Sequence, residues 1–144
     1  MRLQLTRRAD YALRAVLAPA AADRRLLSAE LARRMAIPPG FLPQILPALV
    51  RDGILARSLG RHGGYRLARP TRAIPMLKVI EAADGPARPA ACVLRAGAYR
   101  RERPCAVHPA VAEAQEAMRA ALSGADFAAL VARHETEVAD VLTV

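Results

Sequence analysis

The chain has 144 residues, 53% of them hydrophobic and 24% charged, with a formal net charge of +9. These values allow one compact domain with an appended element, and they exclude a wholly disordered chain and, with only two cysteines, a disulfide scaffold. Aromatic residues make up only 3%, which favours helices over a large sheet. No apolar run is long enough to cross a bilayer, so we expect a cytoplasmic protein with no membrane partner.

The positive charge is concentrated in the first half of the chain. Residues 1–72 hold 14 Arg and 4 Asp or Glu, whereas residues 73–144 hold 8 Lys or Arg and 9 Asp or Glu. A uniform excess of arginine does not produce such a split. The basic half also lacks the aromatic-studded amphipathic helix that binding to a membrane surface favours. The pattern therefore predicts a nucleic-acid-binding half beside a half used for assembly.

Two helices are predicted first. Thr6 is a good N-cap for a helix that ends near Ala20, since apolar residues follow it at helical spacing. Ser28 is a good N-cap for a second, short helix over residues 29–35. The residues between the two helices form a charged loop.

A tight break over residues 36–40, rich in Pro and Gly, separates the short helix from a third helix over residues 41–52. Gly53 ends that helix. Pro43 fits its first turn, but Pro47 is expected to kink the helix or end it early. A short helix, a turn and a second helix make a helix-turn-helix pattern.

The period changes after this motif. Residues 54–58 and 65–68 are predicted to be two strands, and the Gly-rich residues 60–64 form the turn between them. A helix-turn-helix followed directly by a hairpin predicts a mainly α fold: a winged helix-turn-helix with a small β-hairpin wing and a long C-terminal dimerisation helix.

Further helices are predicted in the second half. One has Pro75 at its first position and ends at residues 84–86, one opens at Pro109 and runs to Leu122, and Asp126 caps the last. The stretch before Pro109 has no clear period and holds both cysteines.

Three functional segments follow from this organisation. We expect a DNA-binding domain over residues 1–86, a cysteine-containing sensor loop over residues 87–108, and dimerisation helices over residues 109–144.

The motif and its charge point to double-stranded DNA. Such motifs place the second helix in the major groove, where Gln44 can pair with adenine and Phe41 can touch a thymine methyl. A Gly-rich wing can reach a phosphate backbone or enter a narrow minor groove. Taken singly, Phe41 also fits a core position, and the arginines a solvated face. The candidate contacts are Ser28, Arg33 and Arg34 to phosphates, Pro39, Gly40, Phe41 and Gln44 to bases, and Arg57, Arg61 and His62 from the wing.

Several segments carry a resemblance to a known family. They are Met1-Arg2-Leu3, Tyr11-Ala12-Leu13-Arg14, Phe41-Leu42, Gln44-Ile45-Leu46, Gly53-Ile54, Gly63-Gly64-Tyr65-Arg66-Leu67-Ala68-Arg69-Pro70, Ile80-Glu81-Ala82 and Asp84-Gly85-Pro86. By these segments the chain resembles the IscR/NsrR-type repressors, also called the Rrf-two family. The resemblance implies a homodimer with crossed C-terminal helices that binds a roughly palindromic operator. Leu59 departs from the family, which usually has Arg there, so minor-groove contact would pass to Arg57 or Arg61.

The resemblance also implies a sensor. Many members carry three cysteines in the loop, and these bind an iron–sulfur cluster whose state controls DNA affinity. Cys92 matches the first of them and Cys105 the third, but the middle one would fall near Ala98, where there is no thiol. Two thiolates cannot fill the four ligand positions of a [2Fe–2S] cluster.

Other candidate ligands are available. His108 follows Cys105 by three residues, where some relatives place a ligating His. Asp10 matches an Asp that the nitric-oxide sensors of the family donate from the other subunit, and Glu102 lies in the loop itself. Asp10 and His108 also have structural interpretations: an acid favoured early in a helix, and a His at a helix start.

Three hypotheses therefore remain for the loop. A [2Fe–2S] cluster is held by Cys92, Cys105 and two of Asp10, His108 and Glu102; or the two cysteines form a disulfide switch; or the thiols sense nothing. Nearby arginines favour a reactive thiolate at Cys105, whereas Cys92 lies in an apolar stretch that suits a buried thiol.

Two other classes of protein compete with a DNA-binding regulator. An enzyme is not expected, because the chain has no phosphate-binding Gly loop, no nucleophile motif with a nearby base, and no metal-protease spacing. A module that binds proteins rather than DNA is disfavoured by the basic first half.

Overall fold

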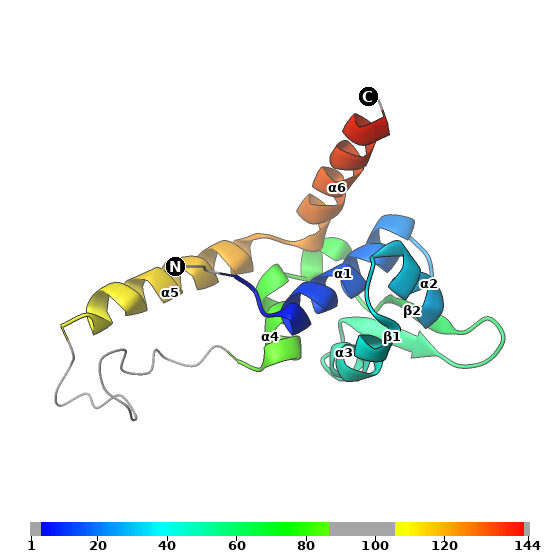
Figure 1. The fold of residues 1–144 in the computed structure, drawn as a ribbon, viewed down its shortest axis with the longest axis horizontal. Coiled ribbons are helices and arrows are strands. Elements are labelled where there is room, and N and C mark those ends of the chain that lie inside the picture. Colours follow the sequence, from blue (N-terminus) through cyan, green and yellow to red (C-terminus); the bar gives the residue numbers. More distant parts are fainter. Residues whose placement is uncertain (1–3, 87–105, 143–144) are drawn as a thin grey trace.

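The computed structural model describes residues 4–86 and 106–142, with side chains as far as residue 135 (Figure 1). In chain order the elements are α1 (Arg7–Ala22), α2 (Ser28–Arg34), the 3-10 turn η1 (Pro39–Phe41), α3 (Leu42–Arg51), β1 (Leu55–Ser58), β2 (Gly64–Leu67), η2 (Thr71–Ala73), α4 (Met76–Asp84), α5 (His108–Gly124) and α6 (Phe127–Leu142). The expected fold class, a mainly α winged helix with one small hairpin, is confirmed.

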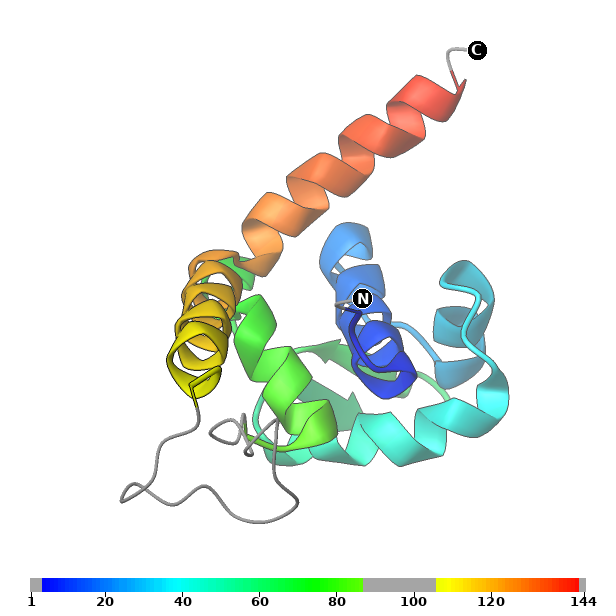
Figure 2. The same ribbon diagram turned by 60° about the vertical axis from the view of Figure 1, so that its left-hand side comes forward.

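Helix α1 runs through the centre, with α4 on one side and α2 on the other (Figures 1 and 2). Its buried face consists largely of alanines, which allow neighbouring helices to approach closely. Thr6 is the N-cap as predicted, because its hydroxyl accepts from the backbone N–H of Ala9 at 3.0 Å. The same hydroxyl donates to the carboxylate of Asp84 at the end of α4. The start of α1 is therefore tied to the end of α4.

The helix-turn-helix is formed by α2, η1 and α3. Leu27, rather than Ser28, is the N-cap of α2 and makes no side-chain cap bond, so the predicted role of Ser28 as a cap was wrong. For Pro47 we predicted a kink or an early end of the third helix, and the early end was wrong, since α3 continues to Arg51. Burial of four large apolar side chains outweighs the backbone hydrogen bond that Pro47 cannot donate. These side chains are Leu42, Ile45, Leu46 and Leu49.

The hairpin pairs β1 with β2 in antiparallel register, with Ala56 opposite Arg66 and Arg57 opposite Tyr65. Each strand lies within one residue of its predicted position. Leu26 extends the sheet on the other edge of β2 through two backbone hydrogen bonds with Tyr65, of 2.8 and 2.9 Å. That third edge was not predicted, because one residue carries no strand pattern.

The last two helices are anchored on the body of the domain. The Asp126 carboxylate accepts from the N–H of Ala129 at 3.0 Å, as a cap at this position predicts. Phe127 is fully buried in the same core as the first four helices. Pro75 is the N-cap of α4 rather than its first helical residue. From this anchor α6 projects away from the body (Figures 1 and 2). No helix within the described ranges is both long and apolar enough to span a membrane.

Candidate nucleic-acid interface

A groove of about 440 Å³ lies where the N-terminal end of α2, the exposed side of α3 and the hairpin meet. We call it the recognition groove. Three residues predicted to contact DNA, Ser28, Pro39 and Arg57, line it together, although they come from three different elements. Its other lining residues are Ala29, Leu42, Pro43, Leu46, Pro47 and Tyr65.

The turn of the motif fixes the angle between α2 and α3. Ala36 has a positive φ of 50°, which reverses the chain directly after α2. Ile37 then enters the core with 2% exposure, and its N–H donates to the carbonyl of Ala32 at 2.9 Å. From α1, the Arg8 guanidinium donates to the backbone carbonyl of Gln44 at 2.9 Å. Helix α3 is therefore held from both the turn and α1.

Gln44 lies on the exposed side of α3, near its start. Its side-chain amide donates to the carbonyl of Gly40 at 3.2 Å. Gly40 is itself exposed, and an added Cβ there would meet nothing within 4 Å. An adenine contact by Gln44 therefore requires exchange of one local hydrogen bond, without any movement of the backbone.

Phe41 is half-buried and packs against the edge of the core. Its ring meets that of Tyr11 edge-on, with centroids 4.9 Å apart and planes inclined by 70°. This T-shaped contact gives Phe41 a packing role between α1 and the motif. Contact with a thymine methyl stays a prediction for the part of the ring that is exposed.

One glutamate on α2 holds two arginines. The Glu30 carboxylate pairs with Arg24 from the preceding loop and with Arg34 one turn along the helix, the latter at 3.0 Å. The hydrogen bond from Arg24 lowers the pKa of Glu30, and the same bond raises the pKa of Arg24. Arg33 is exposed and pairs with no acid among the described residues. Of the two arginines predicted to meet phosphates, Arg34 is therefore partly neutralised.

The wing presents exposed side chains on a tight turn. Arg61 and His62 are exposed, and Leu59 is 79% exposed. A Cβ at Gly63 would lie 2.5 Å from the carbonyl oxygen of Ser58, so only glycine fits that position. The His62 carbonyl accepts from the Arg25 guanidinium at 3.3 Å, which ties the wing to the loop before α2.

The candidate sensor residues are only partly described. Cys92, Glu102 and Cys105 lie outside the described residues, and His108 is the half-buried first residue of α5. Both carboxylate oxygens of Asp10 are bonded to Arg14, at 2.9 and 3.1 Å. In residues 4–86 and 106–135, no three His, Cys, Asp or Glu side chains come together as a metal site would need.

Arg14 links that acid to the motif. Its guanidinium also donates to the carbonyl of Met35, the residue that ends α2, at 3.3 Å, and it lies over the ring of Tyr11. Asp10 thus positions a cation that contacts the turn before the recognition helix.

Of the residues at the interface that were not predicted as contacts, four bear most on its shape and charge. Pro43, Pro47 and Tyr65 line the recognition groove, and Glu30 pairs with two arginines beside it. The spacing of Glu30 and Arg34, four apart on a helix, was a usable signal. In the sequence, the two prolines indicate only where a helix starts or is disturbed, and Tyr65 indicates only a strand. None of the three indicates a position in the groove.

Comparison with known proteins gives one family. The Rrf2 family, described as "Iron-dependent Transcriptional regulator", matches residues 5–133 of the chain. An HTH-type transcriptional regulator of Mycobacterium tuberculosis (strain H37Rv) is 40% identical over 86 residues, covering 58% of this chain and 53% of that protein. An rrf2-like HTH-type regulator of Rhodobacter capsulatus is 36% identical over 106 residues, covering 70% of this chain and 68% of that protein. The chain thus spans about half the length of its mycobacterial relative.

Solved structures agree on the fold. CymR, the global cysteine regulator of B. subtilis, superposes with a TM-score of 0.78 at 18% identity, over 92% of this chain and 98% of that one. IscR of T. potens gives a TM-score of 0.74 at 20% identity, over 94% of this chain and 90% of that one. At these identities the likeness concerns the fold alone.

Proposed function

The chain belongs to the Rrf2 family of DNA-binding transcriptional regulators, and on that premise we propose that it is a homodimeric repressor of a roughly palindromic operator. The observation that carries the proposal is the recognition groove. It brings Ser28, Pro39 and Arg57 together between the helix-turn-helix and the wing, in the basic half of the chain. Enzymatic activity is no part of the proposal, because the family and the named relatives are regulators.

Each element has a distinct task in this proposal. The start of α3 enters the major groove, where Gln44 exchanges its bond to Gly40 for one to a base edge. Ser28 and Arg33 contact phosphates beside it and set its register. Arg61, on the exposed wing tip, contacts the backbone or the neighbouring minor groove.

The homodimer is supported by the shape of the C-terminal helices. Helix α6 leaves the body after its buried first residue, and Leu130, Val131 and His134 are only half-buried in the single chain. On α5, Met118 is 50% exposed. A second copy of the chain would cover such a face, and two-fold symmetry then requires an operator with two related half-sites.

For sensing, we propose the cysteine loop, with a [2Fe–2S] cluster held by Cys92, Cys105 and two of Asp10, His108 and Glu102. The donor set suits mixed ligation, and Asp10 borders an open hollow of about 590 Å³, so its carboxylate is accessible. Ligation by Asp10 requires its ion pair with Arg14 to open. A bound cluster supplies a redox-sensitive centre, and imidazole in place of thiolate raises its potential.

The same loop supports a second proposal without a metal. A Cys92–Cys105 disulfide would form when a cellular oxidant takes two electrons from the thiols, and reduction would return the thiols. The cluster and the disulfide both rest on the presence of these two cysteines. A regulator whose thiols sense nothing is the remaining alternative.

The DNA-binding proposal is tested by selecting bound duplexes from a random pool and measuring their affinity at several salt concentrations. A regulator should enrich a two-fold related sequence, and its affinity should fall steeply with salt because phosphate contacts release counterions. If the chain selects no duplex, or binds with a flat salt dependence, the proposal fails and a protein-binding module is favoured.

The sensing proposals are separated by an ultraviolet–visible spectrum, with iron and sulfide counts, on protein purified without oxygen. Broad visible absorption with matched iron and sulfide supports the cluster, and Cys105→Ser should then abolish the colour. Protein that stays colourless and iron-free after reconstitution eliminates the cluster. Thiol counting before and after oxidation then distinguishes a disulfide switch from inert cysteines.

A further inference from the structure

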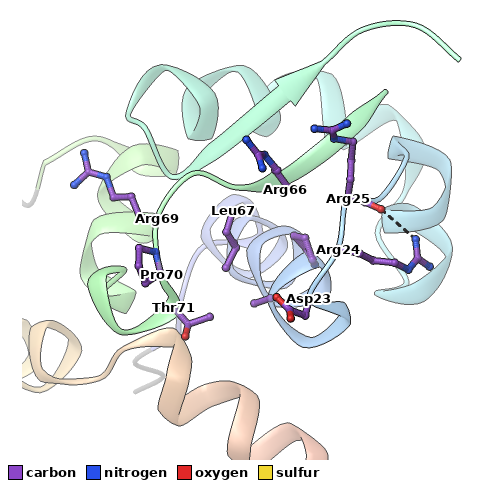
Figure 3. Close-up of a pocket in the computed structure, with 10 residues that line it drawn as sticks. Asp23, Arg24, Arg25, Arg66, Leu67, Arg69, Pro70 and Thr71 are labelled. Carbon is purple, nitrogen blue, oxygen red and sulfur yellow. Dashed lines mark hydrogen bonds between the residues drawn. The ribbon is translucent and has the colours of Figure 1, made fainter. Parts of the chain in front are cut away.

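A further hollow, of about 600 Å³, lies between the end of α1, the loop before α2 and the end of β2. Tyr65 lines the recognition groove, whereas Arg66 and Leu67, the next two residues of β2, line this hollow. Figure 3 shows four arginines around it, two from the loop before α2 and two from the end of β2 onward. We call it the arginine hollow, and define it by Arg24, Arg25, Arg66 and Arg69.

These cations are mostly not neutralised. Arg24 pairs with Glu30, but the Arg25 and Arg69 guanidiniums donate to the backbone carbonyls of His62 and Gly53, which carry no charge. Arg66 is exposed and makes no ion pair within the described part of the chain. Among the residues that line the hollow, the one acid is Asp23. The hollow therefore carries a net positive charge.

The arrangement fits a row of anions better than a single one. In Figure 3 the guanidinium groups of Arg69, Arg66 and Arg25 lie apart from one another and do not converge on one point. Guanidinium groups match phosphate in geometry and remain charged at every physiological pH. A polymer with evenly spaced phosphates meets these cations in turn, whereas a small anion would reach one or two of them.

Two of the arginines link the hollow to the proposed DNA interface. Arg25 is bonded to the wing residue His62 at 3.3 Å, and Arg24 is bonded to Glu30 on the first turn of α2, two residues after Ser28. A DNA strand that extends from Ser28 and the wing toward the loop before α2 would meet these arginines.

We propose that the arginine hollow binds the phosphate backbone of the DNA that flanks the operator, outside the base pairs that α3 reaches. The proposal rests on the DNA-binding function proposed above. On this proposal the hollow adds affinity for DNA of any sequence, because phosphate contacts carry no sequence information.

The test compares two duplexes with the chain in its full length. One holds the in-vitro-selected operator alone, and the other adds flanks of arbitrary sequence on both sides. The wild type should bind the longer duplex more tightly, with a steeper salt dependence. The double variant R66A/R69A should bind both duplexes equally, with its log–log salt slope reduced by about 0.9 for each phosphate that it no longer binds, and should keep its affinity for the short duplex.

A matched control is Arg51→Ala, which removes an exposed arginine from the far end of α3, where it pairs with Asp52. This variant should keep the full difference between the two duplexes, and circular dichroism should show the same helix content for all three proteins. Equal affinity of the wild type for both duplexes would overturn the proposal. An equal loss of affinity by R66A/R69A for the short and the long duplex would also overturn it. The same holds if the hollow binds an acidic peptide that competes with neither duplex. If the wild type binds neither duplex, the DNA-binding function itself is refuted.

Discussion

Glu30 sets how much positive charge the motif offers to DNA. Its carboxylate holds both Arg24 and Arg34, one at the arginine hollow and one at the predicted phosphate contact. The side chain therefore competes with phosphate for two arginines at once. On the proposed function, Glu30 would lower duplex affinity while it ties the loop before α2 to the helix.

Replacing Glu30 with Gln should raise the affinity for an operator duplex by about fivefold and steepen its salt dependence, because up to two arginines become available to phosphates. The measurement is a fluorescence anisotropy titration at several salt concentrations. Glu116→Gln is the control, since Glu116 pairs with an arginine on α5, away from the motif. Equal affinities of E30Q and the wild type would show that phosphate does not compete for these arginines.

The pH dependence of this pairing follows from the pKa of Glu30, which its bond to Arg24 lowers. A lowered pKa means that the stability from the pair is fully present above the unfolded-state pKa and is lost as the pH falls through the lowered value. We therefore expect Glu30 to stay ionised at neutral pH. A carbon-detected NMR titration should give a midpoint below that of a glutamate in an unfolded peptide, and a midpoint at or above it would contradict the pairing.

At the wing, Arg61 is the exposed cation on the turn. Arg61→Ala should weaken duplex binding and flatten the salt slope by about 0.9 per protomer, because each protomer then binds one phosphate fewer. Arg133→Ala on α6 serves as the control for removal of one exposed charge. An unchanged slope for R61A would remove the wing from the interface.

Among the elements, α3 combines a strong core contact with a residue that disfavours helices. Pro47 lies inside the helix and lacks the backbone N–H that would bond to the preceding turn. Pro43 lies in the first turn, where a backbone N–H would have no partner within the helix, so its absence costs little. Both prolines line the recognition groove. Neither proline offers the groove a charge or a side-chain hydrogen-bond donor.

Pro47→Ala should therefore raise the free energy of unfolding by about 1 to 2 kcal/mol. The helix penalty of proline is about 3 kcal/mol, and part of it is offset because proline also restricts the unfolded chain. Pro43→Ala is the matched control and should change stability by less than about 1 kcal/mol. Urea denaturation of both variants decides the point, and a larger gain for P43A than for P47A would contradict the assignment.

For the whole molecule, the C-terminal helices are anchored on the body of the domain. Phe127 lies in the same core as α1 and α4, and the N–H of Phe127 donates to the carbonyl of Ile74 at 3.1 Å. This contact joins the C-terminal helices directly to the body that carries the motif. The contact between Thr6 and Asp84 makes a second link, at the point where the chain enters the cysteine loop.

Val131→Glu should convert the proposed dimer into a monomer, because it places a charge on the half-buried face of α6. Operator affinity should then fall by about 100-fold or more, since the two half-sites no longer act together. Ala128→Glu is the control on the exposed side of the same helix. Analytical ultracentrifugation measures the mass, and a wild type that sediments as a monomer would contradict the homodimer.

The kind and order of the elements follow from local patterns in the amino-acid sequence. The caps at Thr6 and Asp126 and the end of α3 at Gly53 depend on residues adjacent in the chain, so local patterns reveal them. Charge counting predicted a DNA-binding function for the first half of the chain. The cap expected at Ser28 failed because the same residue types also favour turns and loops.

The grouping of side chains from distant segments depends on how the folded chain packs. The pair of Arg24 with Glu30, the ring contact of Phe41 with Tyr11, and the meeting of Arg25 with Arg66 around one hollow each join segments that approach after the chain has folded. Local patterns carry no information about such contacts, because the distance between segments is set by how the helices pack. Burial likewise decided that α3 runs past Pro47, since core contacts outweigh the helix propensity of one residue.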